Sequence, residues 1–65
     1  MKAREVIARL QADGWTLKNS KGGHQHYSHP VKLGKVTVPA HGAKDITKGT
    51  LRSIFRQAGW HWPPN

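Results

Sequence analysis

The sequence of 65 residues contains no cysteine, which removes several kinds of chemistry at once. Disulfide crosslinks, cysteine nucleophiles and zinc sites built from thiolates are all excluded. A chain of this length buries only about 60% of the surface that its unfolded form exposes. We therefore expect one domain whose small core is held by packing alone, with regular elements and short connections.

Long apolar runs are also absent. No segment approaches the ~20 apolar residues of a membrane-spanning helix, and no apolar signal-peptide core follows Met1. We therefore expect a cytoplasmic protein with no membrane partner.

Acidic residues are scarce, whereas basic residues are plentiful. Three Asp and Glu stand against eleven Lys and Arg, for a formal net charge of +8. The bases are spread along the chain, so the folded surface should attract RNA, DNA or an acidic protein. The simpler alternative is that the charge serves only solubility. Metal-dependent nucleases need clustered carboxylates, whereas Glu5, Asp13 and Asp45 are scattered, so we expect no metal or other cofactor.

Two segments have helical periodicity. In residues 3–12 apolar side chains recur at i, i+3, i+4 and i+7, and Asp13-Gly14 follows as a stop. In residues 48–58 a second apolar stripe lies between Thr47, a suitable N-cap, and Gly59, a suitable C-cap. The two stripes consist of Ala3, Val6, Ile7 and Leu10, and of Leu51, Ile54, Phe55 and Ala58.

Three segments between these helices predict strands, at residues 15–19, 24–29 and 36–38. Trp15 and Leu17 alternate with polar residues, as in a half-buried strand. Residues 20–23 end in paired glycines, which are typical of a hairpin turn. Pro30 and Pro39 end the second and third strands, because proline cannot donate to a strand ladder.

The order of the elements predicts an α+β two-layer sandwich, α-β-β-β-α, with a three-stranded antiparallel sheet. Each helix has one apolar stripe, so both should cover one face of the sheet and leave the other open to solvent. We assign residues 1–60 to this single domain and residues 61–65 to a C-terminal tail, loosely docked or disordered. Trp60 and Trp62 could stack on bases, but capping a thin core is the better interpretation.

Three histidines fall within six positions in the second predicted strand. Because side chains alternate along a strand, His24 and His26 share one face, and Tyr27 and His29 share the other. Tyr27 is the only large apolar ring in the segment and should face the core. We therefore expect His24 and His26 on the open face of the sheet.

An exposed imidazole on a basic surface suits cleavage of RNA without a metal. RNA carries its own nucleophile, the 2′-hydroxyl, so an enzyme needs a base, an acid and positive charge beside the phosphate. Imidazole can serve as acid or base near neutral pH, and lysine or arginine supplies the charge. Lys21 should project near His24 and contact the backbone of bound RNA.

The histidines leave other interpretations open. His24 and His26 could bind zinc together with His29 or His41, but cysteine and nearby acidic ligands are missing. His24 could also be an ordinary exposed strand residue. His41 is a phosphate contact or, as we favour, an ordinary loop residue.

Two other motifs are equally open to a plain structural interpretation. Gly22-Gly23 precedes a strand and not a helix, so a hairpin turn explains it better than a phosphate-cradling loop. Arg52 and Arg56, four residues apart on the second predicted helix, either bind phosphate or form a solvated face, and we give the two equal weight.

Several ordered motifs run along residues 1 to about 60. They are Met1-Lys2-Ala3-Arg4-Glu5-Val6-Ile7, Asp13-Gly14-Trp15, Gly22-Gly23-His24-Gln25-His26-Tyr27-Ser28-His29-Pro30, Val36-Thr37-Val38-Pro39-Ala40-His41, and Gly49-Thr50-Leu51-Arg52-Ser53-Ile54 with Ala58-Gly59. No single piece is diagnostic, but in this order and at this spacing the set resembles the HicA toxin family.

The resemblance implies a fold similar to the double-stranded RNA-binding domain. It also implies a ribosome-independent endoribonuclease that cuts mRNA and is blocked by a HicB-type antitoxin. The position of the family's catalytic histidine matches His24. Gly23 stands where the family usually has serine, and Gln25 where a second histidine is common.

We therefore predict a metal-independent endoribonuclease, the toxin of a type II toxin–antitoxin system, with His24 as its catalytic residue. It would act on single-stranded RNA or mRNA and be monomeric when free. The residues predicted to bind RNA are Lys18, Lys21, Gly22, Gly23, His26, Arg52 and Arg56. The main alternative is a non-catalytic basic RNA-binding module, in which His24 is dispensable. A third is an interaction protein whose charge serves to meet an acidic partner.

Overall fold

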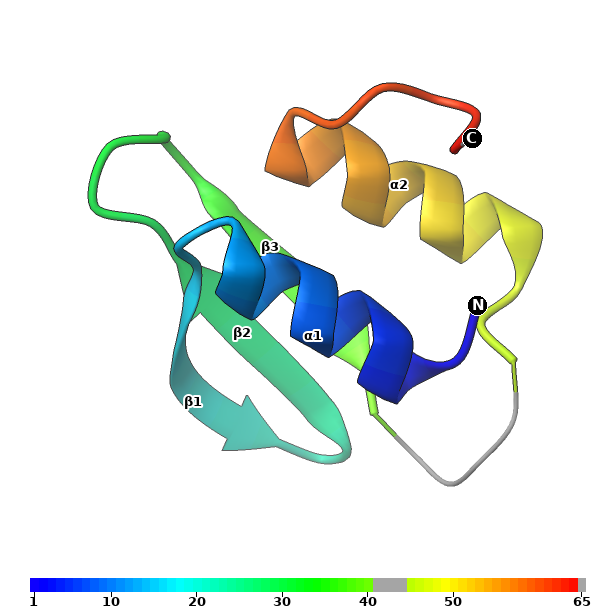
Figure 1. Cartoon of the computed structure of the whole chain (residues 1–65). Helices are drawn as coiled ribbons and strands as arrows, with labels where there is room; N and C mark the ends of the chain where they lie inside the picture. Colours follow the sequence, from blue (N-terminus) through cyan, green and yellow to red (C-terminus); the bar gives the residue numbers. More distant parts are fainter. Residues whose placement is uncertain (41–44, 65) are drawn as a thin grey trace.

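The computed structural model describes residues 1–40 and 45–64. Within them the chain forms two helices and one antiparallel sheet with the strand order β1-β2-β3 (Figure 1). The elements are α1 (Ala3–Ala12), β1 (Thr16–Lys21), β2 (His24–Ser28), β3 (Lys35–Pro39) and α2 (Lys48–Ala58). The domain is a flat slab with extents of 30 × 29 × 17 Å. The predicted α+β order is confirmed, and it is consistent with a fold like the double-stranded RNA-binding domain.

Both helices begin and end where the periodicity predicts. α1 is capped by the Lys2 amide, which donates to Glu5 Oε1 at 2.7 Å. α2 ends at Gly59, whose φ of 75° is the left-handed conformation expected of a glycine C-cap. Thr47 holds the N-cap position, but its hydroxyl donates to Thr50 Oγ1 at 3.1 Å and does not cap a backbone amide. Neither helix of the described residues is long and apolar enough to cross a membrane.

The core is one apolar cluster between the helices and one face of the sheet. Tyr27, Val36 and Val38 bring side chains from β2 and β3, and both helices pack against β3. The helical contribution is the buried part of the two predicted stripes, Val6, Leu10, Leu51, Ile54, Phe55 and Ala58. The opposite sheet face is left without a helix, as predicted.

The first strand differs from the prediction. It begins at Thr16, so the buried Trp15 lies just before it, and every side chain of β1 is exposed, including half of Leu17. The pairing register of β1 with β2 shifts between Leu17 and Asn19, which marks a β-bulge. A bulge re-aims the side chains after it, and both helices pack toward β3 at the far edge of the sheet. The expectation of a half-buried strand at residues 15–19 is therefore wrong.

The hairpin is tighter than predicted. β1 continues to Lys21, and the turn contains only Gly22 and Gly23, with φ of 58° and 81°. Positive φ at both central residues is the type I′ geometry that matches the twist of the flanking strands, and glycine adopts it without strain. The turn therefore places Lys21 directly opposite His24 in the sheet.

The tryptophans after α2 cap the core, as the better of the two interpretations expects. Trp60 and Trp62 each make an edge-to-face contact with Phe55, at ring-centroid distances of 5.1 and 5.4 Å. Arg9 covers the same cluster, its guanidinium lying 4.7 Å from the Trp60 ring centre. The residues following α2 thus join the two helices over the core.

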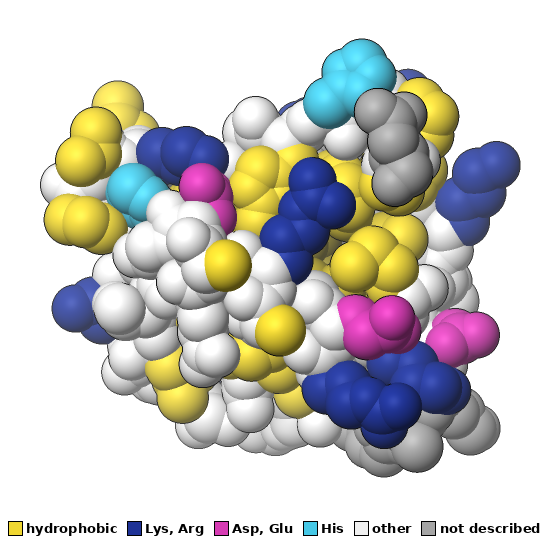
Figure 2. Space-filling view, in the orientation of Figure 1, with side chains coloured by type: hydrophobic (Ala, Val, Ile, Leu, Met, Phe, Trp, Pro, Cys, Tyr) yellow, Lys and Arg dark blue, Asp and Glu magenta, His cyan; other side chains and the backbone are white. Residues whose placement is uncertain are grey.

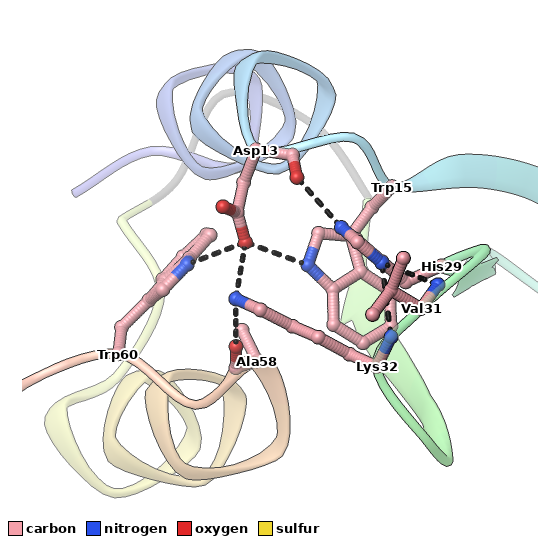
Figure 3. Close-up of polar contacts among 7 residues, drawn as sticks. All are labelled: Asp13, Trp15, His29, Val31, Lys32, Ala58 and Trp60. Atoms are coloured by element: carbon pink, nitrogen blue, oxygen red, sulfur yellow. Dashed lines mark hydrogen bonds and ion pairs between the residues drawn. The ribbon is translucent and has the colours of Figure 1, made fainter.

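A polar cluster closes the end of the domain where β2 finishes (Figure 3). One oxygen of Asp13, Oδ2, accepts hydrogen bonds from Trp15 Nε1, Trp60 Nε1 and Lys32 Nζ at 3.0, 3.1 and 2.7 Å. Lys32 Nζ also donates to the Ala58 carbonyl at 3.0 Å. The pKa of the Asp13 carboxyl is lowered from 3.8 to about 2, first by the hydrogen bond from Lys32 and then by that from Trp60.

His29 belongs to the same cluster. It follows β2 and was expected on the strand's inner face. Its Nε2 donates to the Asp13 carbonyl at 2.8 Å, and its Nδ1 accepts from the Val31 and Lys32 amides at 3.0 Å each. The ring also meets Trp15 edge to face at 5.2 Å. We call this set, Asp13, Trp15, His29, Lys32 and Trp60, the Asp13 cluster.

Candidate functional site

His24 lies at the opposite end of β2 from the Asp13 cluster. Across β2 and β3, Gln25 pairs with Val38 and Tyr27 with Val36, and both valines and Tyr27 are buried. Side chains alternate along a strand, so His24 and its partner Pro39 face the other way. His24 is exposed on that open face, which is where the alternation predicts it.

A hollow of about 380 Å³ begins at His24. It lies at the β3 edge of the sheet, beside α2. Its lining comes from two elements far apart in the sequence, with His24, Thr37 and Pro39 on the sheet and Gly49, Thr50, Ser53, Ile54 and Gln57 on α2. The imidazole therefore stands beside a concave surface and not on a flat one.

Gln57 links α2 to β3 beside this hollow. Its Oε1 accepts a hydrogen bond from the backbone amide of Thr37 at 3.1 Å. β3 is an edge strand, and an unpaired edge amide is a site for unwanted pairing with another chain. The Gln57 contact satisfies that amide and links β3 to α2, whose position is set by its buried residues in the core.

His26 is more buried than His24. It is half-buried, and its Nδ1 lies 2.9 Å from Thr37 Oγ1 on the neighbouring strand. The two histidines share the open face, as predicted, but their surroundings differ. His26 does not itself line the hollow, but it contacts Thr37, which does, so its ring suits a positioning role more than proton transfer.

The hairpin turn carries three of the predicted RNA contacts. Lys21 is exposed and pairs across the strands with His24. The Gly23 carbonyl accepts the Ala40 amide at 2.7 Å, which ties the turn to the end of β3. Lys18 is exposed at the bulge of β1, where it has no partner in the β1–β2 register. The structure thus brings Lys21, Gly22 and Gly23 to His24.

The first turn of α2 adds electropositive backbone to the same hollow. Gly49 and Thr50 of this turn line it. The first amides of a helix have no partner within the helix, and they carry the positive end of the helix dipole. Because the Thr47 hydroxyl is turned to Thr50, it does not occupy these donors. This end of the hollow suits a phosphate oxygen.

Arg52 and Arg56 lie outside this hollow. They are exposed on α2 and line a second hollow of about 430 Å³ together with Gly49, Ser53, Trp60 and Trp62. Gly49 and Ser53 line both hollows, so the two are neighbours on either side of one short stretch of α2. The predicted basic residues therefore form two groups with a common border.

A family model described as the HicA toxin of bacterial toxin–antitoxin systems matches residues 3–60. The chain belongs to the HicA toxin family. It is similar to a solved structure described as "HicA3 and HicB3 toxin-antitoxin complex", with 33% sequence identity and a TM-score of 0.72. That match covers 92% of this chain and 96% of the other. A comparison with curated proteins gave no significant match.

None of the three acids of this HicA family member is among the residues that line the two hollows. Glu5 accepts the Lys2 amide, Asp13 lies in its cluster with Lys32, and Asp45 pairs with Lys2 at 3.5 Å. In the view of Figure 2 acidic side chains lie beside Lys or Arg. Among residues 1–40 and 45–64, no ion pair involves Arg52 or Arg56. The two hollows therefore lie in an uncompensated positive field.

The histidines that the structure describes in this HicA chain do not gather at one site. Within the described residues, no three His, Asp or Glu side chains come together as metal ligands would. His29, considered above as a zinc ligand with His24, is bonded to backbone groups at the other end of β2. His41 lies outside the described residues.

Sequence reasoning missed part of this candidate site. Thr37, Ser53 and Gln57 were not singled out, because single polar residues at these places carry no motif. Gly49 did carry a signal, since glycine inside a helix costs stability relative to alanine. No heavy atom outside its neighbours lies within 4 Å of where its Cβ would be, so packing does not explain it.

Proposed function

We propose that this HicA toxin is a metal-independent endoribonuclease that cuts single-stranded regions of mRNA, with His24 as its catalytic residue. The single observation that carries the proposal is the exposed His24 imidazole at the rim of a hollow in a positive field. Family membership supports the toxin role, and the substrate and the chemistry are inferred from the site.

The reaction needs proton transfer and little else from the protein. The 2′-oxygen of RNA attacks the adjacent phosphorus, and the bond to the 5′-oxygen breaks. The 2′-hydroxyl loses a proton to a base, and the leaving 5′-oxygen gains one from an acid. His24 serves as that base or that acid, because imidazole exchanges protons near neutral pH.

Charge beside the phosphate completes the proposed site. Lys21, opposite His24 in the sheet, would hold a backbone phosphate near the imidazole. Gly49 and Thr50 of the first turn of α2 line the hollow, and the amides of this turn would face the same phosphate. Donors fixed in advance stabilise negative charge as it develops in the transition state.

We further propose that a HicB-type antitoxin covers this surface, and that the toxin is a monomer when free and acts in the cytoplasm. The similar solved structure is a complex of HicA3 with HicB3. Because the surface around the hollow is positively charged, we expect the antitoxin to place acidic side chains against it.

The test is digestion of a single-stranded RNA in EDTA by wild-type protein and by His24→Ala. Removal of a general acid or base should slow scission about 10²- to 10⁴-fold. His61→Ala removes another exposed histidine, outside the hollow, and should cut at the wild-type rate. Circular dichroism of each variant checks the fold.

The same assay separates the rival function. If wild type binds the RNA without cutting it, the protein is a non-catalytic RNA-binding module on the same basic surface. If His24→Ala cuts as fast as wild type, the catalytic assignment is lost even though the protein is a nuclease.

A further inference from the structure

We propose that the second hollow, beside α2, is a nucleotide subsite in which Trp62 stacks on a base and Arg52 and Arg56 hold the flanking phosphates. The subsite rests on the proposed action on RNA, and extends it to nucleotides beyond the one at His24. The sequence offered these two pairs of residues as separate alternatives, and the fold places them around one space.

The two tryptophans can both cap the core and meet a ligand. Trp60 and Trp62 touch Phe55 edge to face, so each uses only part of its ring in that contact. Both remain half-buried and line the hollow. Trp60 makes two more contacts within the protein, because its Nε1 donates a hydrogen bond to Asp13 and the Arg9 guanidinium covers its ring. Trp62 is therefore the better stacking surface.

The two arginines supply positive charge for the phosphates that flank a stacked base. Arg52 and Arg56 are one helical turn apart on the exposed side of α2, and neither forms an ion pair with an acid of the described residues. Guanidinium groups bind phosphate oxygens in a fork geometry. Aromatic side chains interleaved with such cations are the usual platform for single-stranded nucleic acid.

The size of the space fits the ligand. At about 430 Å³ the hollow lies within the range of about 300–1,000 Å³ typical of small-ligand sites. It is walled by charged and aromatic groups together. A nucleotide has one apolar ring and one anionic group, and matches that lining better than a purely apolar or purely acidic ligand.

Gly49 lies on the border between the two hollows. It and Ser53 border both spaces, and a Cβ at Gly49 would project into open space. A glycine that neither packing nor positive φ requires leaves a low point between the hollows. A single strand can then pass from His24 over Gly49 to Trp62, with a phosphate at each basic group.

The experiment measures binding without cleavage. A fluorescein-labelled nonanucleotide with 2′-O-methyl groups throughout cannot be cut, because it has no free 2′-hydroxyl. Trp62→Leu keeps an apolar side chain against Phe55 but removes the stacking surface, and should weaken binding about 5- to 150-fold. Trp62→Phe retains a ring and should bind within about 3-fold of wild type, a limit set well below the stacking effect.

The same oligonucleotide tests the phosphate contacts of the two arginines and the route of the strand over Gly49. Arg52→Ala and Arg56→Ala should each reduce the slope of log K against log salt by about 0.7, the value for one phosphate on a single strand. Arg4→Ala removes an exposed arginine on α1, outside both hollows, and should leave the slope unchanged. Gly49→Gln should lower the affinity of the nonanucleotide toward that of a trinucleotide.

The outcomes separate this subsite from the proposed function. Wild-type affinity and slope in Trp62→Leu and Arg52→Ala would overturn the subsite, whatever His24→Ala does to cleavage. Weakened binding by Trp62→Leu, with normal cleavage by His24→Ala, would keep the subsite and remove the catalytic assignment. Binding of a ten-residue polyglutamate at the hollow, with no binding of the oligonucleotide, would also overturn it.

Discussion

The two ends of β2 carry histidines in opposite circumstances. At the far end His29 has both ring nitrogens bonded to backbone groups and one edge against Trp15. At the near end His24 is exposed beside a hollow in a positive field. One strand of five residues thus separates a histidine that holds the fold from one that we propose does chemistry.

The two ends also differ in whether their charged side chains form ion pairs. In the Asp13 cluster a carboxylate meets a lysine and two indole donors, and the lysine also binds a helix carbonyl. Around the hollows, Lys21, Arg52 and Arg56 have no acid beside them in the described part of the chain. Charges that face each other stabilise this fold, whereas charges left facing solvent are available to a polyanion.

The largest expected effect is the difference in stability between the variants His29→Ala and His24→Ala. His29→Ala removes three hydrogen bonds and a ring contact, and should lower the free energy of unfolding by about 2–3 kcal/mol. For a domain of this size that corresponds to a fall in Tm of roughly 10–20 °C in thermal circular dichroism. His24→Ala should cost less than about 1 kcal/mol, as exposed positions do.

Activity should show the reverse order. Below its own Tm, His29→Ala should retain most of the RNA scission that His24→Ala loses. Equal destabilisation by the two alanine variants would erase the distinction drawn between the ends of β2.

A smaller effect should appear in acid. Because the pKa of Asp13 is about 2 when folded and 3.8 ordinarily, the folded state binds this proton less readily than the unfolded state. Its contribution to stability is therefore fully present above about pH 4 and is lost as the pH falls toward 2. One third of the Asp13 side chain is exposed, so solvent screening limits the contribution to about 1 kcal/mol.

Urea titrations between pH 5 and pH 2 measure that loss. Asp13→Asn should remove the part of the pH dependence due to this carboxyl. Glu5→Gln is the matched control at the other end of α1, and it should keep the loss near pH 2–4. An unchanged profile in Asp13→Asn would assign acid sensitivity to another group.

The smallest predicted effect is a gain. Gly49→Ala should stabilise the protein by up to about 0.5 kcal/mol, less than in a helix interior because Gly49 is the second residue of α2, and its Cβ meets no atom. A rise in Tm of a few degrees, measured by thermal circular dichroism, would check this. A fall in Tm would mean that the glycine serves the fold and not an open path between the hollows.

Local pattern was enough for much of the fold. The apolar spacing predicted helices at 3–12 and 48–58, and both are found there. Alternation around Tyr27 placed His24 on the open face. These features depend on neighbours within a few positions, through the 3.6-residue and two-residue periods of helix and strand. A motif set along the chain was likewise enough to recognise the HicA family.

Long-range contacts decided the rest. Asp13, which the sequence marks only as a helix stop, receives Trp60 from 47 positions away. Leu17 is exposed because the helices pack toward the other edge of the sheet. Arg52, Arg56 and the tryptophans surround one hollow only because the chain after α2 folds back on Phe55. Sequence periodicity shows which face a side chain takes, but only tertiary packing determines which distant residues that face will meet.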